Sequence, residues 1–400
     1  MKSFSMFDLV AFEVIFLTPL ILPPFPFRGV IFFSLLTVCY AGIVRSTTGE
    51  PLFDWCLGLS TTTQMFKSSD LLILSDPERD FWQNGKQSGD ALQLGPWEKT
   101  KWAAELAYSP RGVGWNWEIP YISYSGTKSR RSFLLSRGCR CVAYYLLLDV
   151  INNAGPLPGF PGVHDHLFFD SLNAVAFVWS FAISAYISFW LAQTLPYVLL
   201  VLLGLASPED FAHVLGPASA MFTFRRLWGR VWHQIARRQI SSHGCLIARK
   251  LLRAPPGSIR SRYAQLYVGF AIGATTHAVA GLMAARSSSH SRWEDPTCAL
   301  RVFASYAVVI TMEDGLIQLM ERCRILPPGW GRDDLKSLTE SSRMEGKRRL
   351  VCWRRVFGYI WVVFWLTVTS VSYVEGLKTA GVIGPRFKLP FSVVRYVSRS

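Results

Sequence analysis

Long apolar runs separated by short, strongly basic segments constrain this chain more than any other feature. Tyr263–Ala285 contains no acidic residue, lysine or arginine, and a bilayer core needs about 20 apolar residues in a helix. Comparable runs are Leu9–Pro24, Gly29–Val44, Leu172–Leu191, Ala299–Leu319 and Val356–Tyr373. Leu195–Ala206 is expected to form a tight hairpin with the run before it, and Val142–Ile151 is a weaker candidate. We therefore predict an all-α, polytopic helical bundle with about seven to nine spans.

Composition supports this class. Half of the 400 residues are hydrophobic and only 17% are charged, whereas an average soluble domain has roughly 25% charged residues. A soluble chain of this length would still need a charged surface. The distribution of charge along the chain therefore decides between a soluble protein and a membrane protein.

The net charge of +15 is concentrated in two blocks. No acidic residue lies between Asp210 and Glu294, and a dense basic run extends from Arg225 to Arg262. A second basic block lies at 322–355, two predicted spans further on, so both blocks are expected on the same, cytoplasmic side. This pattern favours membrane topology over nucleic-acid binding. Such a face can attract anionic lipid headgroups or receive the phosphates of a nucleotide cosubstrate.

The chain is expected to form one membrane-embedded domain with three regions. Residues 1–66 hold the first spans, residues 67–140 form an interfacial loop region, and residues 141–400 hold the core spans. The loop region contains the Gly- and Trp-rich segment Arg111–Trp117 (RGVGWNW), and indole rings commonly lie at the membrane interface.

His277 is the histidine that lies within an uncharged predicted span. Ionisable residues in a span are costly and usually face the bundle interior or a polar cavity. Small residues surround it, which allow helices to approach closely or leave room for a substrate: Gly269, Gly273, Ala274, Ala278 and Gly281. The alternative is a histidine that only forms a hydrogen bond across a helix interface.

Other polar residues offer competing interpretations. The remaining six histidines are expected in loops or at helix ends, and His233 lies in a basic, aromatic stretch at a predicted membrane edge. Glu313 and Asp314 lie within a predicted span and are expected to pair with arginines or to orient a histidine. His164-Asp-His166 has a metal-like spacing but no third ligand nearby. His166 and Asp170 match a short HxxxD pattern that is common by chance. We predict no metal site.

Three stretches together resemble the fungal wax-synthase-like branch of the membrane-bound O-acyltransferases. RGVGWNW at 111–117 is similar to the RGxGWNW signature of that branch, and WGRVWHQ at 228–234 is similar to its WGRxWHQ motif. Residues 270–277 resemble its F-x-x-S-G-x-x-H membrane motif. The order and spacing of the motifs agree, and the similarity covers most of the chain.

The resemblance implies a role for individual residues. His277 matches the buried histidine that acts as general base, and His233 matches the second active-site position, where wider relatives have Asn or His. Trp228, Arg230, Arg237 and Arg238 are expected on the CoA side. The sequence departs from the family pattern at two places: Arg226-Leu227 replaces Asp-Phe, and Gly273-Ala274 replaces Ser-Gly.

The activity that the resemblance implies is transfer of an acetyl group from acetyl-CoA to a hydroxyl of a terpenoid or meroterpenoid, in fungal secondary metabolism. CoA would reach a two-histidine site from the cytoplasm, as a cosubstrate rather than a bound cofactor, in an endoplasmic-reticulum membrane. Three alternatives stay open: a long-chain wax-ester-type acyltransferase, a non-catalytic scaffold, and a transporter or channel with a polar pathway along His277, Glu313 and Asp314.

Overall fold

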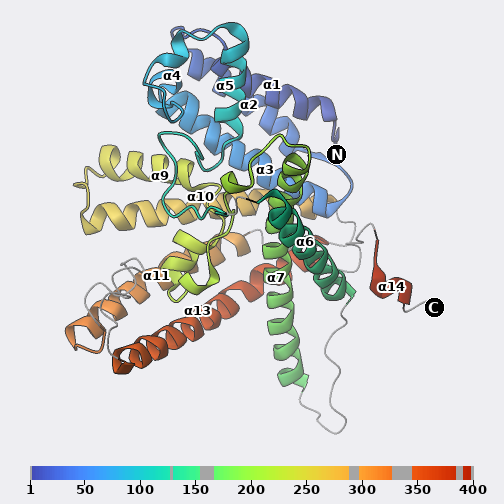
Figure 1. The fold of residues 1–400 in the computed structure, drawn as a ribbon, viewed down its shortest axis with the longest axis vertical. Coiled ribbons are helices and arrows are strands. Elements are labelled where there is room, and N and C mark those ends of the chain that lie inside the picture. The colour runs from blue at the N-terminus through green and yellow to red at the C-terminus, as the bar shows by residue number, and fades with distance from the viewer. Residues whose placement is uncertain are drawn as a thin grey trace. The chain divides into compact units, whose positions relative to one another are not determined.

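The computed structural model describes residues 2–126, 129–153, 166–287, 297–326, 345–383 and 391–397 (Figure 1). Within these residues the regular secondary structure is almost entirely helical, which confirms the predicted all-α class. The strands in this part of the chain are β1 (Lys2–Ser3) and β2 (Ser46–Thr47), which pair in parallel.

The chain forms two compact units whose segments alternate along the sequence. Unit 1 comprises residues 1–120, 235–304 and 375–383, and unit 2 comprises residues 121–234, 305–374 and 384–400. The predicted division into three consecutive regions stays a prediction, and each unit is described by itself below.

Unit 1 is built around three long N-terminal helices and the long helix α10 (Ile259–Ser287). The N-terminal helices are α1 (Met6–Ile21), α2 (Arg28–Val44) and α3 (Pro51–Ser69). The shorter elements are the π-helix η1 (Asp70–Leu74), α4 (Pro77–Asp80), η2 (Asp90–Leu92), α5 (Pro96–Tyr108), α9 (Arg237–Cys245) and the π-helix η6 (Leu246–Leu251). Apolar side chains from α1, α2 and α5 form its fully buried core, among them Phe12, Phe16, Leu36 and Leu106.

Unit 2 contains α6 (Arg130–Asn153) and α7 (His166–Leu202), which pack together. Its shorter elements are η3 (Pro208–Asp210), η4 (Ala218–Ala220), α8 (Phe224–Arg226), the π-helix η5 (Leu227–Val231) and α14 (Val393–Val397). Two helices contribute residues to both units: α11 (Cys298–Arg322) and α13 (Glu345–Thr379). Phe133, Val201 and Phe211 form one buried cluster of this unit.

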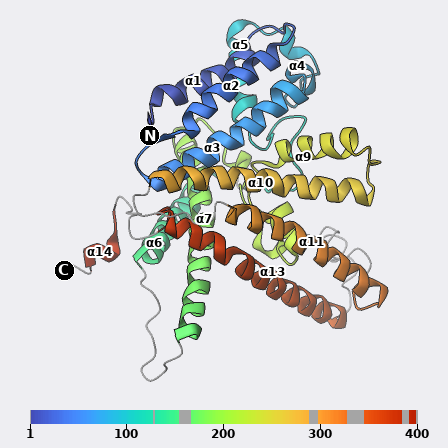
Figure 2. The ribbon, with the colours of Figure 1, turned by 180° about the vertical axis from the view of Figure 1, so that it is seen from behind.

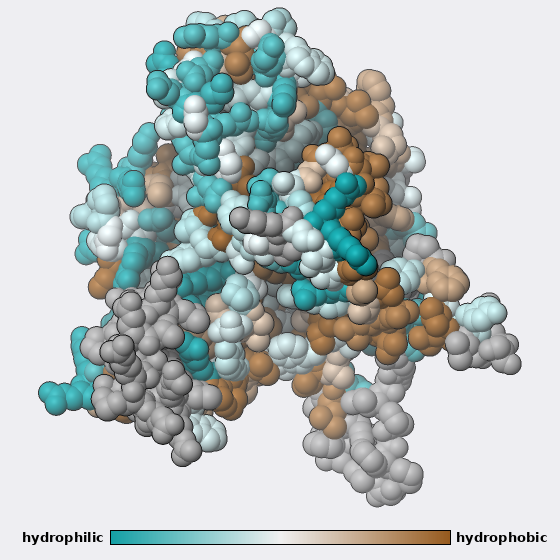
Figure 3. All heavy atoms as spheres, in the orientation of Figure 1, coloured by the Kyte–Doolittle hydropathy of each residue, from teal (hydrophilic) through white to brown (hydrophobic). Residues whose placement is uncertain are grey.

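Four of the described helices are long and apolar enough to cross a membrane. They are the segments Leu172–Leu202, Ile259–Arg286, Cys298–Arg322 and Trp353–Thr379, and the apolar α2 is shorter. The predicted total of seven to nine spans therefore stays a prediction. Large apolar side chains are exposed along these helices, for example Phe357 on α13 and Leu199 on α7, and Figure 3 shows broad apolar areas on the surface in view. Such surfaces suit contact with lipid.

The hairpin predicted for Leu195–Ala206 is wrong. The structure has one continuous helix, α7, with Pro196 inside it and its end at Leu202. A proline removes one backbone donor but is tolerated within transmembrane helices, where neighbouring groups compensate for the lost bond. The apolar run therefore continues instead of turning.

Small residues set the close helix packing around α10. A Cβ at Gly58 of α3 would lie 2.6 Å from the Cα of Ala280, so the α3 and α10 backbones touch. Gly244 of α9 lies in the same way against Gln265 of α10. The predicted close approach of helices along this span is confirmed. Within unit 1, α9 packs along the first half of α10 and α3 along its second half (Figure 2).

Candidate active site

His277 lies on α10 between two aromatic side chains of unit 1. Its ring centroid is 4.7 Å from that of Phe303, with planes 30° apart, and 6.1 Å from that of Trp55. The imidazole is half-buried. Contacts with two aromatic rings restrict the orientation of the imidazole.

Gly273 makes the stack on His277 possible. It lies one helical turn before the histidine, and a Cβ there would be 2.9 Å from the Phe303 ring. The departure from Ser-Gly to Gly273-Ala274 thus leaves space that Phe303 fills, while Ala274 is buried. A side chain at position 273 would compete with the ring for that space.

The WGRVWHQ motif lies in unit 2, on the π-helix η5 and the three residues after it. The Trp228 ring stacks on Tyr306 of α11 at 4.8 Å, with planes 32° apart. The Arg230 guanidinium lies 4.1 Å from the Tyr121 ring and donates to the Tyr121 hydroxyl. π-Helical turns are rare and are frequently found at functional sites, and no sequence pattern predicted this one.

His233 is held between rings in the same unit. Its imidazole lies 4.4 Å from the Phe189 ring of α7, with planes 31° apart, and 5.3 Å from Trp232. Its Nδ1 is buried without a hydrogen-bond partner in the described structure. Burial lowers the pKa of His233 from 6.5 to about 4, so the ring is neutral near pH 7. A neutral imidazole offers one N–H donor and one acceptor nitrogen.

Gln234 fixes the end of the motif. Its Nε2 donates to the carbonyl oxygen of Trp228 at 2.9 Å and to that of Trp232 at 2.7 Å. A single amide therefore joins the start of the π-turn to the residue directly before His233.

Arg226 stands where the family pattern has an acid, and its side chain has partners of its own. The side chain is buried, its Nε donates to the carbonyl oxygen of Ala220, and its guanidinium lies 4.5 Å from the Phe222 ring. Leu227 is buried as well. The departure at 226–227 is thus accommodated by a backbone carbonyl and an aromatic face.

Glu313 and Asp314 both support α8, the short helix directly before the WGRVWHQ motif. Glu313 accepts the backbone N–H groups of Phe224 (2.6 Å) and Arg225 (2.9 Å), where α8 begins. Asp314 forms a two-point ion pair with Arg225. The expected pairing with an arginine is confirmed for Asp314, while Glu313 holds backbone donors and not a histidine.

Arg237 and Arg238 lie on α9 and belong to unit 1, whereas Trp228 and Arg230 belong to unit 2. Both arginines line a hollow of about 370 Å³ with Ser241, Ser242 and the segment at 117–120. Arg238 also stacks on Phe81 and Trp117. The structure thereby brings Trp117, the last residue of the RGVGWNW motif, together with Arg237 and Arg238, which follow the WGRVWHQ motif in sequence.

Two polar pairs were missed by the sequence reasoning. Arg238 Nε lies 3.0 Å from the buried carboxylate of Asp70. The Ser69 hydroxyl lies 2.7 Å from Nε2 of His243, whose Nδ1 lies 2.6 Å from the carbonyl oxygen of Gln239. His243 is thus inside a helical stretch, against the expectation that six histidines lie in loops or at helix ends.

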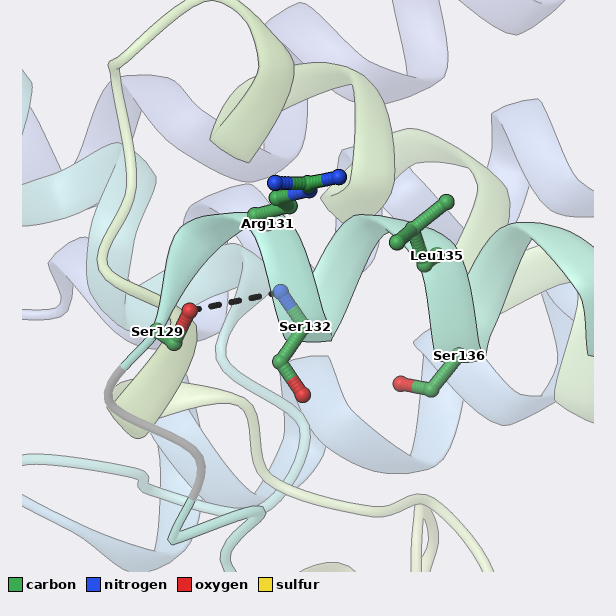
Figure 4. A pocket seen from close by; sticks show the side chains of 5 residues that line it. All are labelled: Ser129, Arg131, Ser132, Leu135 and Ser136. Atoms are coloured by element: carbon green, nitrogen blue, oxygen red, sulfur yellow. Dashed lines mark hydrogen bonds between the residues drawn. The ribbon is translucent and has the colours of Figure 1, made fainter.

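Other expected features contribute less. His164-Asp-His166 falls outside the described residues, as do the side chain of Asp170 and most of the second basic block. A second hollow of about 510 Å³ lies along the start of α6. Figure 4 shows Ser132 and Ser136 on one side of this helix and Arg131 and Leu135 on the other. None of these lining residues is an acid–base group suited to neutral pH, and none was predicted.

Comparison with known proteins gives a consistent class. The family model described as Membrane bound O-acyl transferase family matches residues 211–304, which include both histidines. The chain is 29% identical over 340 residues to acetyltransferase ple2 of Rhodocybe pseudopiperita, covering 83% of this chain and 80% of the relative. It is 28% identical to acetyltransferase eriL of Hericium erinaceus, covering 92% and 89%. It is also 28% identical to acetyltransferase atnC of Arthrinium sp, covering 74% and 66%. No solved structure gives a significant match.

These matches confirm the resemblance that the motifs indicate. The protein is an integral membrane enzyme of the acyltransferase class. More particularly, it is related to the membrane-bound O-acyltransferases and to fungal acetyltransferases, and nothing in the comparisons supports the transporter alternative.

Proposed function

We propose that the protein transfers an acetyl group from acetyl-CoA to a hydroxyl of an apolar terpenoid or meroterpenoid acceptor, in an endoplasmic-reticulum membrane. The observation that carries the proposal is His277, an imidazole fixed by Phe303 inside an apolar candidate span. The names of the fungal relatives, all acetyltransferases, support the donor.

In the proposed step, His277 takes the proton of the acceptor hydroxyl as the oxygen attacks the thioester carbonyl. The C–O bond forms, the C–S bond breaks, and the CoA sulfur leaves and receives the proton from the imidazolium. General-base assistance of this kind contributes roughly 10²–10⁴-fold. The step needs no covalent acyl-enzyme.

His233 is proposed to stabilise the developing oxyanion through a neutral N–H. Its lowered pKa and its contacts with Phe189 and Trp232 support a fixed, uncharged donor. Preoriented donors at a developing oxyanion are typically worth about 10²–10³-fold in rate.

Arg237 and Arg238 are proposed to receive the phosphates of the donor, and Trp228 and Arg230 to act on the CoA side. Arginines suit phosphate recognition because the guanidinium presents several donors in one plane. The α9 hollow adds the serine residues Ser241 and Ser242. Glu118 in the same hollow accepts the backbone N–H of Gly114 at 3.0 Å.

Microsomes that contain the full chain test the proposal. They are incubated with acetyl-CoA and hydroxylated terpenoids, and products are followed by mass spectrometry; the expected result is a gain of one acetyl mass. His277→Ala should abolish this gain at unchanged protein level, and His277→Gln serves as a variant that keeps a polar side chain. Wild-type turnover in His277→Ala would overturn the base assignment. Products formed only with long-chain acyl-CoA would overturn the acetyl donor.

A further inference from the structure

The turn between η6 and α10 combines positive charge with exposed aliphatic side chains. We define the hairpin tip as residues 249–262 of unit 1, which run from the end of η6 to the start of α10. Its basic residues are all exposed: Arg249, Lys250, Arg253, Arg260 and Arg262. The tip holds no acidic residue, and the sequence has none between Asp210 and Glu294. In Figures 1 and 2 the α9–α10 pair extends beyond the α1–α5 helices of its own unit.

Three large aliphatic side chains of the tip are more than half exposed. Leu251 is 72%, Leu252 59% and Ile259 64% exposed. They lie next to the basic residues and at the beginning of the candidate span Ile259–Arg286. Aliphatic side chains beside cations at the end of a span fit a bilayer interface, where the former enter the acyl boundary and the latter meet phosphates.

Arg253 occupies a backbone position that favours glycine. Its φ is 48°, in the left-handed region. The Ala254 N–H donates to the carbonyl oxygen of Ala248, and the Leu252 N–H to that of Ile247, both at 2.9 Å. Helices that end in this way commonly have glycine at the left-handed residue, because a side chain is disfavoured there. A cation at this position is therefore kept against the local backbone preference.

We propose that the hairpin tip binds the anionic phospholipid headgroups of the leaflet it faces. Each basic residue near a membrane surface contributes about 1 kcal/mol of attraction to anionic lipid, or about fivefold in affinity. Soluble phosphates of a cosubstrate would use the cations but not the exposed leucines. The hollow lined by Arg237 extends along α9 as far as Cys245, and none of the tip residues lines it. The proposal does not depend on the acetyl-transfer reaction.

The test is thermal unfolding of the purified full chain in detergent micelles, with added phosphatidylserine or phosphatidylcholine. A ligand that binds only the folded state raises the midpoint, by an amount that grows with the logarithm of its concentration above the dissociation constant. Phosphatidylserine should raise the midpoint more than phosphatidylcholine does, and raised salt should weaken the effect. For the same rise in midpoint, Arg253→Gly should require about fivefold more phosphatidylserine than the wild type.

Arg253→Gly is a suitable variant because it removes the charge and relieves the backbone together. Without lipid, its midpoint should equal or exceed that of the wild type. Arg253→Lys should keep the lipid response. The double variant Arg249→Ser/Lys250→Ser should also reduce the response to phosphatidylserine, because it removes two charges of the tip without changing the backbone at residue 253. Lys86→Ser, at an exposed lysine of unit 1 outside the tip, is the matched control and should leave it unchanged.

Three results would overturn the proposal. One is an equal effect of the two lipids on the wild type. Another is an unchanged phosphatidylserine response in both Arg253→Gly and Arg249→Ser/Lys250→Ser. The last is a midpoint increase with CoA alone that is lost in the same tip variants, which would assign the tip to the cosubstrate.

Discussion

The imidazole of His277 and the phenyl ring of Phe303 lie 4.7 Å apart between centroids, with their planes at 30°. One comes from the middle of α10 and the other from the first turns of α11, and Gly273 leaves the space in which the second ring lies. The orientation of the proposed base thus depends on a residue that has no functional group.

Gly273→Ala is expected to lower kcat by about 10- to 100-fold without unfolding the protein. The added Cβ would lie 2.9 Å from the Phe303 ring, so the ring must move and His277 loses its support. Displacements of about 1 Å can cost 10²-fold in rate. Steady-state kinetics in microsomes measure the effect. Gly315→Ala on α11, where a Cβ meets nothing within 4 Å, is the control and should retain activity. Wild-type kcat in Gly273→Ala would contradict the dependence on Phe303.

His233 is expected to act without changing its protonation state over the working pH range. Burial lowers the pKa of His233 to about 4, so the ring stays neutral where an ordinary histidine with a pKa of 6.5 would become charged. His233→Asn, which keeps an N–H donor, should retain more activity than His233→Leu. The ratio of wild-type to His233→Asn activity should be constant between about pH 5 and 8. A ratio that changes with a midpoint near pH 6.5 would show a charged, exposed imidazole instead.

The same low pKa predicts a loss of stability in acid. The unfolded chain takes up a proton on His233 near pH 6.5, whereas the folded chain does so near pH 4. Between these values the unfolded state binds more protons, so the free energy of unfolding falls as the pH falls. The His233→Asn variant lacks this group and should lose less stability between the two pH values. Thermal midpoints of both proteins across this range measure the difference, and parallel curves would contradict the assignment.

Asp70→Asn is expected to destabilise unit 1 by about 1–3 kcal/mol. It leaves the guanidinium of Arg238 without its carboxylate in a mostly buried setting. Asp76→Asn is the control, because its pair with Arg79 is exposed on both sides and should contribute under about 1 kcal/mol. Midpoints in detergent compare the two, and equal midpoints would show that the buried pair adds no stability.

Glu313→Ala is expected to destabilise the start of the WGRVWHQ segment and to lower activity with it. The change leaves the N–H groups of Phe224 and Arg225 without their acceptor, at about 1–3 kcal/mol for each buried donor. Glu313→Gln keeps one carbonyl oxygen and should lose less. Limited proteolysis and activity measured on the same samples test this. If both variants match the wild type, another acceptor must serve these two donors.

Local pattern predicted the long apolar helices and the close packing along α10, but neither α3 nor the rings of Trp55 and Phe303 beside His277. An uncharged run specifies a helix, and glycine and alanine at helical spacing specify close packing, so α10 with Gly273 follows from the sequence. The hairpin predicted within α7 was wrong. A proline such as Pro196 usually indicates the end of a helix, whereas a helix in a membrane can continue through it.

Contacts between distant segments had no such signal. Asp70 and Arg238 are 168 positions apart, and Ser69 and His243 are 174 apart. The pattern of residues within each segment does not predict which distant residue it will contact, because each pair forms only after α3 and α9 have packed. The π-helical turn at 227–231 likewise had no local signal, because its residues also suit an α-helix and its Trp228 packs on Tyr306 from a distant segment.

The two hydrogen bonds of the Gln234 amide have a consequence for how this segment can vary among related proteins. They close a loop between the carbonyls of residues 228 and 232, so the length of that loop is fixed even where its side chains are not. Substitutions can accumulate inside it, but an insertion or deletion would shift His233 out of register with the tryptophan before it. A gap in an alignment at this place should therefore mark a protein that has changed or lost its reaction.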